Sequence, residues 1–141
     1  MATYPATVHL VTADGTERPR PIAVRVALRA GAVELTLGDL SGAEALHFAL
    51  AMCVFNNVTR ESRERGIRLR ELTVTADGDF DADDLSTGIS FSVSIAGDGT
   101  EAALRSVAQF AADDSSIART LRRPTSVALS GIETRVTFGG A

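Results

Sequence analysis

Short stretches of the chain alternate apolar and polar residues, which is the period of a half-buried β-strand. The clearest is Ile89–Ile95, in which a serine separates each pair of apolar residues. The same alternation predicts strands over Ala6–Val11, Ile22–Leu28, Val33–Leu37, Ile67–Val74 and Val127–Phe138. The phase of the alternation changes near Arg70–Glu71 and again at Ser130–Gly131. At Ser130–Gly131 a β-bulge would return the apolar side chains to the inward face of the sheet. The acidic stretch Asp77–Asp84 is expected to be a solvated hairpin loop.

A long helix is predicted from Ser41 to Gly66. Ser41 and Glu44 have the spacing of a capping box, in which each side chain binds the other residue's backbone amide, and Gly66 suits the position that ends a helix. The first half of this helix is apolar on nearly every side, and its second half is polar. A helix that is apolar all round must be covered by protein, whereas one sheet covers only one side. We therefore expect a partner subunit to cover another side.

A second helical region begins near Thr100, breaks around Asp113, and continues as a short helix, Ile117–Arg122. Ser115 and Ser116 are expected to cap the short helix. One apolar stripe of the first helix consists of Leu104, Val107, Ala108 and Ala111. The predicted order is three strands, a long helix, two strands, two helices and a final strand. This order predicts an α+β fold with helices packed on antiparallel strands, in a single domain over residues 1–141.

The composition is that of a folded globular protein, with 45% hydrophobic and 23% charged residues. The net charge is −4, and the arginines are interleaved with acidic residues, so nucleic-acid binding is not expected. The first residues lack the basic and apolar regions of a secretory signal, and the longest apolar run, Ala45–Phe55, is too short to span a membrane. A single cysteine fits a reducing compartment. We expect a cytoplasmic protein that does not bind membranes.

Cys53 falls in the apolar half of the long helix and is the main candidate for chemistry. Its sulfur would need a nearby cation or hydrogen-bond donor, because the thiolate is the nucleophile and the thiol is not. The arginines of the N-terminal region could supply the cation: Arg18, Arg20 and Arg25. The alternative is that Cys53 acts only as a small buried apolar residue.

Other polar residues around Cys53 have structural explanations. Asn56 and Asn57 border its face of the helix, where they could bind a substrate or the thiol, or else meet water or backbone. His47 is expected to be partly buried and hydrogen-bonded rather than a base. Two histidines and one cysteine without ligand spacing argue against zinc, and no nucleotide-binding loop is present, so we expect no metal or cofactor.

The segment Gly42–Cys53 resembles the start of the long helix in the OsmC-like family (osmotically inducible and organic-hydroperoxide-resistance proteins), commonly written P-x-E-L-L-x-A-A-L-x-x-C. Gly42 replaces the proline. Arg65–Leu69 and Val74–Phe80 are similar to that family's "GI.L…V.V.G.F" segment, and Asp113–Leu121 lies where the family has a C-P-[VL]-S-x-x-L motif. The resemblance covers residues 42–138. It implies an intertwined homodimer with its sites at the subunit interface.

Many proteins of this family are thiol peroxidases for organic hydroperoxides. The resemblance implies that Cys53 attacks the peroxide and that an arginine paired with a glutamate activates its thiol. These roles carry over to Glu44 and to Arg25, with Arg18 and Arg20 left open as alternatives to Arg25. Glu44 already has a capping role and lies nearly opposite Cys53 on the helix, so it would act through an arginine or across the dimer.

Ser115 stands where the family has its second, resolving cysteine. A hydroxyl cannot close a disulfide, so the two-cysteine cycle is impossible within this chain. Two interpretations remain open. In the first, Cys53 is oxidised by a small-molecule hydroperoxide to a sulfenic acid, which an external thiol reduces. In the second, the chain is a non-catalytic dimer that binds a small apolar or thiol-containing metabolite beside an apolar collar of Leu46, Leu50 and Phe55.

Overall fold

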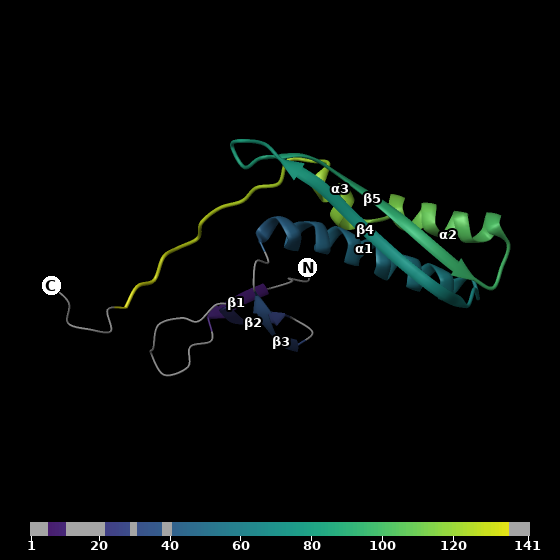
Figure 1. The fold of residues 1–141 in the computed structure, drawn as a ribbon, viewed down its shortest axis with the longest axis horizontal. Helices are drawn as coiled ribbons and strands as arrows, with labels where there is room; N and C mark the ends of the chain where they lie inside the picture. Colours follow the sequence, from purple (N-terminus) through teal and green to yellow (C-terminus); the bar gives the residue numbers. More distant parts are fainter. Residues whose placement is uncertain (1–5, 11–21, 29–30, 38–40, 136–141) are drawn as a thin grey trace. The chain divides into compact units, whose positions relative to one another are not determined.

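The computed structural model describes residues 6–10, 22–28, 31–37 and 41–135. The chain divides into two compact units, Met1–Leu46 and His47–Ala141, and each is described by itself. Figure 1 labels the elements of both units. The single domain expected from the sequence stays a prediction.

The N-terminal unit contains a three-stranded antiparallel sheet in the order β1-β2-β3. Its strands are β1 (Ala6–Leu10), β2 (Ile22–Leu28) and β3 (Gly31–Leu37). Three of the predicted strands are thereby confirmed. The register places Arg25 of the central strand opposite His9 of β1 and Glu34 of β3.

The long helix, α1, spans Gly42–Glu64. With 23 residues it is about 35 Å long. At its start the backbone N–H of Glu44 donates to Ser41 Oγ at 3.2 Å, which is the Ser41 half of the predicted capping box. Beyond its end Gly66 has a φ of +68°, a left-handed conformation that glycine adopts without steric cost. Both predicted ends of the helix are confirmed.

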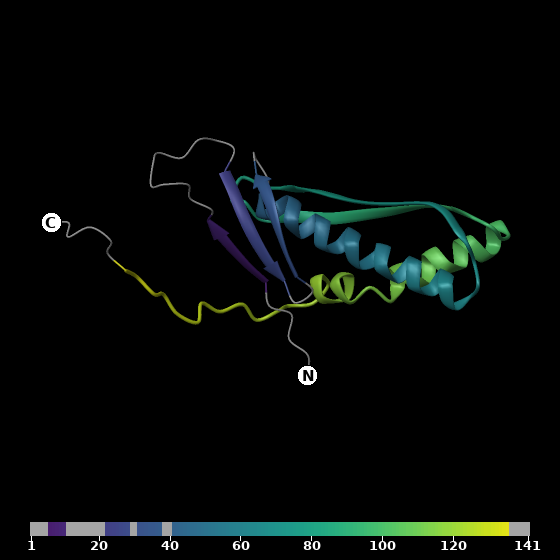
Figure 2. The ribbon, with the colours of Figure 1, turned by 90° about the horizontal axis from the view of Figure 1, so that it is seen from below.

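An antiparallel hairpin follows α1 and consists of β4 (Leu69–Phe80) and β5 (Ser86–Gly97). Figure 2 shows this hairpin running along α1. The register shifts between Leu69 and Glu71, so Arg70 is the extra residue of an irregularity at the predicted change of phase. The alternating apolar side chains therefore return to the face that packs on the helices.

The hairpin loop is shorter than predicted. The expected loop Asp77–Asp84 is wrong in its first half, because β4 continues to Phe80. Asp77 and Asp79 occupy exposed positions of the strand and alternate with half-buried neighbours. Since a strand points every second side chain outward, acidic residues can lie on it without being buried.

Two shorter helices complete the second unit: α2 (Glu101–Asp113) and α3 (Ser116–Leu121). Each begins at a hydroxyl cap; the start near Thr100 and the cap of the short helix at Ser115 were predicted. Thr100 Oγ1 accepts from the backbone N–H of Ala103 at 3.1 Å, and Ser115 Oγ accepts from the backbone N–H of Ala118 at 3.1 Å. Within the described ranges, no helix has the length and apolar character needed to cross a membrane.

The core of the second unit lies where the three helices meet the hairpin. Its buried apolar residues are Leu50, Val54, Val58, Val107, Ala111 and Ala118. Half-buried apolar side chains of the hairpin pack against them, Val74, Phe91 and Val93 among others. Val54 and Val58 have no exposed surface, and burial of each such side chain contributes roughly 2 kcal/mol to folding.

A second apolar face of α1 is not covered by the described residues. Phe48 is 66% exposed and Met52 is 39% exposed. Ala49, which lies on the same side of the helix, is exposed as well. The helix thus buries a single stripe, although its first half is apolar on nearly every side.

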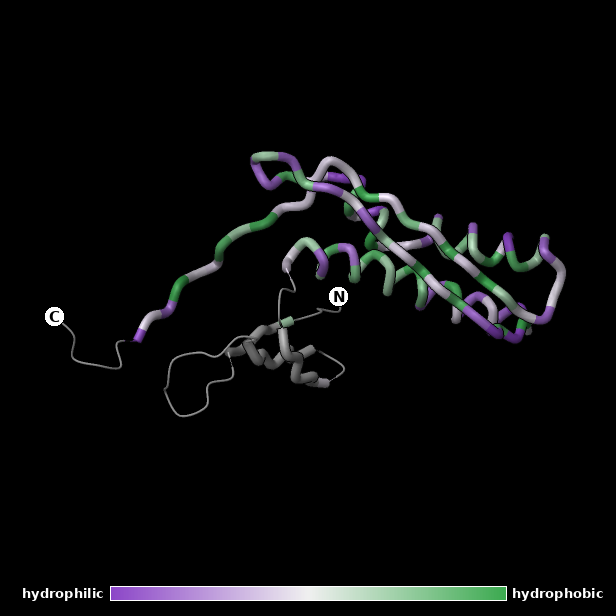
Figure 3. Tube along the Cα trace, in the orientation of Figure 1, coloured by the Kyte–Doolittle hydropathy of each residue, from purple (hydrophilic) through white to green (hydrophobic). Residues whose placement is uncertain are grey.

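The predicted final strand is not formed in its described part, since residues 124–135 contain no strand. Its apolar side chains are exposed: Val127 by 92%, Leu129 by 79% and Ile132 by 79%. Figure 3 shows these apolar positions spaced along the segment. A strand needs a neighbouring strand for its backbone hydrogen bonds, and the described residues offer it none. The bulge expected at Ser130–Gly131 therefore has no ladder to interrupt, and residues 136–138 lie outside the described ranges.

A buried amide joins α1 to α2. Asn57 is 7% exposed, and its Nδ2 donates to the carbonyl oxygen of Ala111 at 3.2 Å. Its Oδ1 accepts a hydrogen bond from Nη2 of Arg60 at 2.9 Å. Because Ala111 belongs to the last turn of α2, this amide satisfies a carbonyl that the helix itself leaves open and holds the end of α2 against α1.

We expect Asn57→Ala to lower the free energy of unfolding by about 1–3 kcal/mol, because it removes the side-chain donor of a buried carbonyl. Urea unfolding followed by circular dichroism measures this change. The matched control is Asn56→Ala, whose exposed side chain should change stability by less than about 0.5 kcal/mol. Equal effects of the two substitutions would contradict the role given to Asn57.

The hairpin leaves no room for a side chain at Gly78. A Cβ atom there would collide with the carbonyl oxygen of Gly88 and lie 3.3 Å from the Cα of Ile89. We expect Gly78→Ala to destabilise the protein by about 1–3 kcal/mol. Gly99→Ala, where a Cβ meets nothing within 4 Å, should be neutral or slightly stabilising. Thermal unfolding compares the two, and a smaller loss for Gly78 than for Gly99 would be the contrary result.

Candidate functional site

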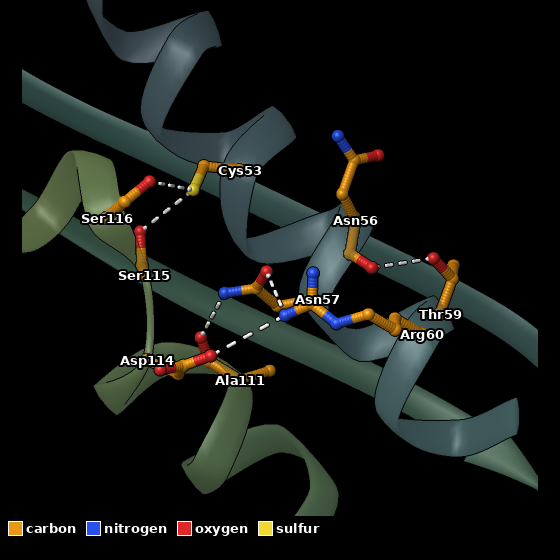
Figure 4. Close-up of polar contacts among 9 residues, drawn as sticks. All are labelled: Cys53, Asn56, Asn57, Thr59, Arg60, Ala111, Asp114, Ser115 and Ser116. Carbon is orange, nitrogen blue, oxygen red and sulfur yellow. Dashed lines mark hydrogen bonds and ion pairs between the residues drawn. The ribbon is translucent and has the colours of Figure 1, made fainter. Parts of the chain in front are cut away.

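Cys53 lies in the middle of α1 on the side that faces the junction between α2 and α3, as Figure 4 shows. Its side chain is a half-buried free thiol. The next residue, Val54, belongs to the fully buried stripe of the helix. The sulfur is therefore at the margin of the core.

Two hydroxyl groups from the α2–α3 junction contact the sulfur. Ser115 Oγ donates to Cys53 Sγ at 3.3 Å, and Ser116 Oγ lies 3.6 Å from the same atom. Ser115 has no exposed surface, whereas Ser116 is exposed. The residue that stands at the resolving-cysteine position of the resemblance, Ser115, is thus in contact with the candidate nucleophile.

Burial raises the pKa of the Cys53 thiol, but hydrogen bonds outweigh this effect and hold the pKa below its ordinary value. The largest lowering comes from the Ser115 hydroxyl, followed by the backbone of Ile117 and then the side chain and backbone of Ser116. Donors that point at a sulfur favour its anion. Within the described part of the chain, the groups that favour the thiolate come from residues 115–117.

A polar cluster fixes the position of this junction, as Figure 4 shows. Arg60 Nη2 lies 3.5 Å from Asp114 Oδ2 and also donates to Asn57 Oδ1. Asn57 in turn donates to the carbonyl of Ala111. The ion pair is half exposed and stabilises little by itself, but together these bonds anchor the residues that precede Ser115.

The arginine expected beside the thiol is not described. Arg18 and Arg20 lie outside the described residues, and the structure gives the backbone of Arg25 in β2. Arg60 lies two turns beyond Cys53 on the same helix, where its guanidinium group is occupied by Asn57 and Asp114. The pairing of Cys53 with Arg25 stays a prediction.

Glu44 is exposed in the first turn of α1, where the capping arrangement with Ser41 was expected. His47 is half buried as expected, and its ring stacks on Phe80 at a centroid distance of 6.1 Å. The hydrogen bond predicted for His47 is wrong as far as the described residues show, because its buried Nε2 has no partner among them. The ring of Phe80, which stacks on His47, offers neither a hydrogen-bond acceptor nor a donor.

The remaining neighbours of Cys53 are mostly exposed to solvent or used in packing and backbone hydrogen bonds. Asn56 is exposed, and Asn57 binds backbone, which was one of the two alternatives for that residue. Of the apolar collar, Leu50 belongs to the core, while Leu46 and Phe55 are half buried. The collar is therefore partly used in packing.

Sequence reasoning missed that both serines contact the sulfur. It assigned Ser116 to helix capping, whereas Ser115 is the cap and Ser116 Oγ faces Cys53. For Ser115 the available signal was the family motif across Asp113–Leu121, because Ser115 stands where that family has its second cysteine. In the part of the chain that the structure describes, no three His, Cys, Asp or Glu side chains could together hold a metal ion.

Comparison with solved structures shows the same fold in several proteins. An OsmC-like protein from Mycoplasma pneumoniae has a TM-score of 0.61 at 15% identity, covering 86% of this chain and 88% of that one. A hypothetical protein from Aquifex aeolicus VF5 has a TM-score of 0.66 at 12% identity, with coverages of 86% and 89%. An OsmC-like hydroperoxide resistance protein from Jannaschia sp. CCS1 has a TM-score of 0.51 at 12% identity, with coverages of 84% and 85%.

No curated protein matches the chain. The family model described as OsmC-like protein matches residues 36–130, which is more than half of the chain and includes α1, the hairpin and the junction with both serines. The structural neighbours have the same mixed fold of helices and antiparallel strands. The chain belongs to the OsmC-like family.

Proposed function

We propose that this protein is a one-cysteine, thiol-dependent reductase of organic hydroperoxides, with Cys53 as the nucleophile. The observation that carries the proposal is the Cys53 sulfur itself, half buried and contacted by the Ser115 hydroxyl at 3.3 Å in a chain of this family. The lowered pKa of this thiol supports the same role, because a peroxide is attacked by the thiolate. The hydroperoxide resistance protein among the structural neighbours favours this class of substrate.

In the first step the Cys53 thiolate attacks the terminal oxygen of the hydroperoxide. The S–O bond forms as the O–O bond breaks, and the alkoxide that leaves takes a proton from solvent to become the alcohol. The sulfur is oxidised to a sulfenic acid and the peroxide is reduced. A half-buried sulfur at the margin of the core is accessible to such a substrate while its hydrogen bonds to the serines persist.

In the second step an external thiol reduces the sulfenic acid. The Ser115 hydroxyl is within contact distance of the sulfur but cannot form an S–S bond. A first thiol therefore condenses with the sulfenic acid to a mixed disulfide and releases water, and a second thiol releases Cys53 and leaves as a disulfide.

Glu44 and Arg25 complete the proposed site. Arg25 would bring a guanidinium to the thiolate or the peroxide, and Glu44 would orient that arginine through an ion pair. Glu44 reaches Cys53 only through such a partner, since the two lie nine residues apart on nearly opposite sides of α1. Arg18 and Arg20 are the alternatives to Arg25.

We also propose that two copies of the chain form a homodimer. The exposed apolar face of α1, with Phe48 and Met52, needs a cover, and so do the exposed apolar side chains of Val127, Leu129 and Ile132. A second copy offers the same surfaces in return, as a two-fold interface requires. In a homodimer the last segment would find the neighbouring strand that it lacks within the described chain.

We expect the protein to consume an organic hydroperoxide in the presence of excess dithiol, and Cys53→Ser to abolish this consumption. Cumene hydroperoxide loss followed with the native protein and the variant measures it. Equal rates in both would contradict the redox function and leave the ligand-binding interpretation. The same assay on Arg18→Ala, Arg20→Ala and Arg25→Ala shows which arginine serves Cys53, and a normal rate in Arg25→Ala removes that assignment.

We expect sedimentation at micromolar concentration to give twice the 14.8 kDa mass of one chain. Phe48→Glu should give the single-chain mass, because a charge on the proposed interface would be buried without a partner. The control Leu85→Glu should leave the dimer intact, since Leu85 is nearly as exposed, at 64%, but lies in the hairpin loop. A native protein of single-chain mass would contradict the dimer.

A further inference from the structure

We propose that Ser115 is a fixed hydrogen-bond donor to the sulfur of Cys53 and holds it as the thiolate. The residue that occupies the resolving-cysteine position would thereby have kept its contact with the nucleophile and changed its task from bond formation to charge stabilisation. The catalytic consequence rests on the proposed peroxidase function, but the hydrogen-bonding role does not.

The direction of this hydrogen bond is favoured by the other bond that the hydroxyl makes and by its burial. Ser115 Oγ accepts from the backbone N–H of Ala118 at 3.1 Å, as the cap of α3. A hydroxyl has one proton and two lone pairs, so an oxygen that accepts here has its single proton free for another partner. That partner is Cys53 Sγ at 3.3 Å. The sulfur accepts this proton, since the buried hydroxyl would otherwise leave it without an acceptor, and a thiolate accepts far better than a thiol.

The burial of Ser115 favours the hydrogen bond from its hydroxyl to the sulfur. Ser115 has no exposed surface, so water cannot take its proton if the sulfur does not. A buried donor without an acceptor costs the folded state the desolvation of that group. The junction that carries Ser115 is also anchored from both sides, by the bond from Asn57 to Ala111 and by the capped turn of α3.

Ser116 differs from Ser115 in its exposure and in the direction of its hydrogen bond. Its hydroxyl lies 3.6 Å from the sulfur, belongs to an exposed residue, and either atom of that pair could be the donor. It can follow the protonation state of Cys53, donating to the thiolate or accepting from the thiol. Ser115 is buried, and among the described residues its proton has Cys53 Sγ as its acceptor. The two serines therefore predict different effects on the same sulfur.

The experiment is a titration of Cys53 in the full-length protein. The thiolate absorbs near 240 nm, and the chain contains one cysteine, one tyrosine and no tryptophan, so the signal below the range of tyrosine ionisation belongs to Cys53 alone. Ser115→Ala should reduce the acid dissociation constant of the thiol roughly tenfold, the size expected when one hydrogen bond to a charged acceptor is lost. Ser116→Ala should have a smaller effect.

Reaction with a neutral aromatic disulfide gives a second readout that a purely structural role would not produce. A higher pKa leaves less thiolate at low pH but makes each thiolate a stronger nucleophile, by about threefold for a tenfold change in acidity. The pH profiles of native protein and Ser115→Ala should therefore cross, with the variant slower by about threefold at low pH and faster by about threefold above both pKa values.

Controls separate the hydroxyl's bond to sulfur from its role as a helix cap. Thr100→Ala removes the equivalent cap of α2 without touching Cys53, so it should lower the melting temperature by a similar amount and leave the titration unchanged. If Ser115→Ala does not fold, Ser115→Gly tests the same point, because glycine is tolerated at a helix cap and has no hydroxyl. Ser115→Thr restores the hydroxyl and should return the acid dissociation constant toward the native value.

An unchanged titration in Ser115→Ala and Ser115→Gly, or an equal effect of Thr100→Ala, overturns the proposal. Because the titration and the disulfide probe use no peroxide, they decide the role of Ser115 whether or not the protein consumes hydroperoxides. If Ser115→Ala shifts the titration of Cys53 as expected and the native protein does not consume peroxides, only the proposed function is refuted.

Discussion

The candidate site depends on the buried amide of Asn57. Its bond to the carbonyl of Ala111 joins two residues 54 positions apart and fixes where α2 ends against α1. Apolar contacts such as those of Val54, Val107 and Ala111 determine how closely the helices approach, but they are not directional. A hydrogen bond from a buried amide is directional, so it also sets the rotation of the junction. The hydroxyl of Ser115 meets the sulfur at the junction that this bond helps to anchor.

Much of the fold follows from local chemistry in the sequence. The cap at Ser41, the left-handed glycine at Gly66 and the cap at Thr100 each involve residues within a few positions of one another, and all three are present. The irregularity at Arg70 could be predicted as well, because an interrupted alternation shows in the sequence itself. Periodicity fails where a partner decides the outcome. Residues 127–135, the described part of the predicted final strand, alternate like a strand, yet a strand exists only beside another one.

The site was predictable in part. Cys53 and the position of Ser115 followed from the family motifs. The two positions that carry the family's cysteine pair are in contact in this structure as well. The contact of Ser116 and the cluster of Asn57, Arg60 and Asp114 could not be predicted, because they join side chains of α1 to a junction more than fifty residues away. His47 shows the same limit, since its sequence neighbours do not reveal that Phe80 covers its ring.

The serine beside the sulfur also changes how oxidation affects the conformational entropy of the unfolded chain. A disulfide between these two positions would close a loop spanning 62 residues and restrict the unfolded ensemble, by an entropy equivalent to about 4 kcal/mol. With serine there, oxidised and reduced forms have the same covalent connectivity. The conformational freedom of the unfolded chain, and with it the resistance to heat or denaturant that a cross-link confers, is therefore uncoupled from the redox state of the sulfur.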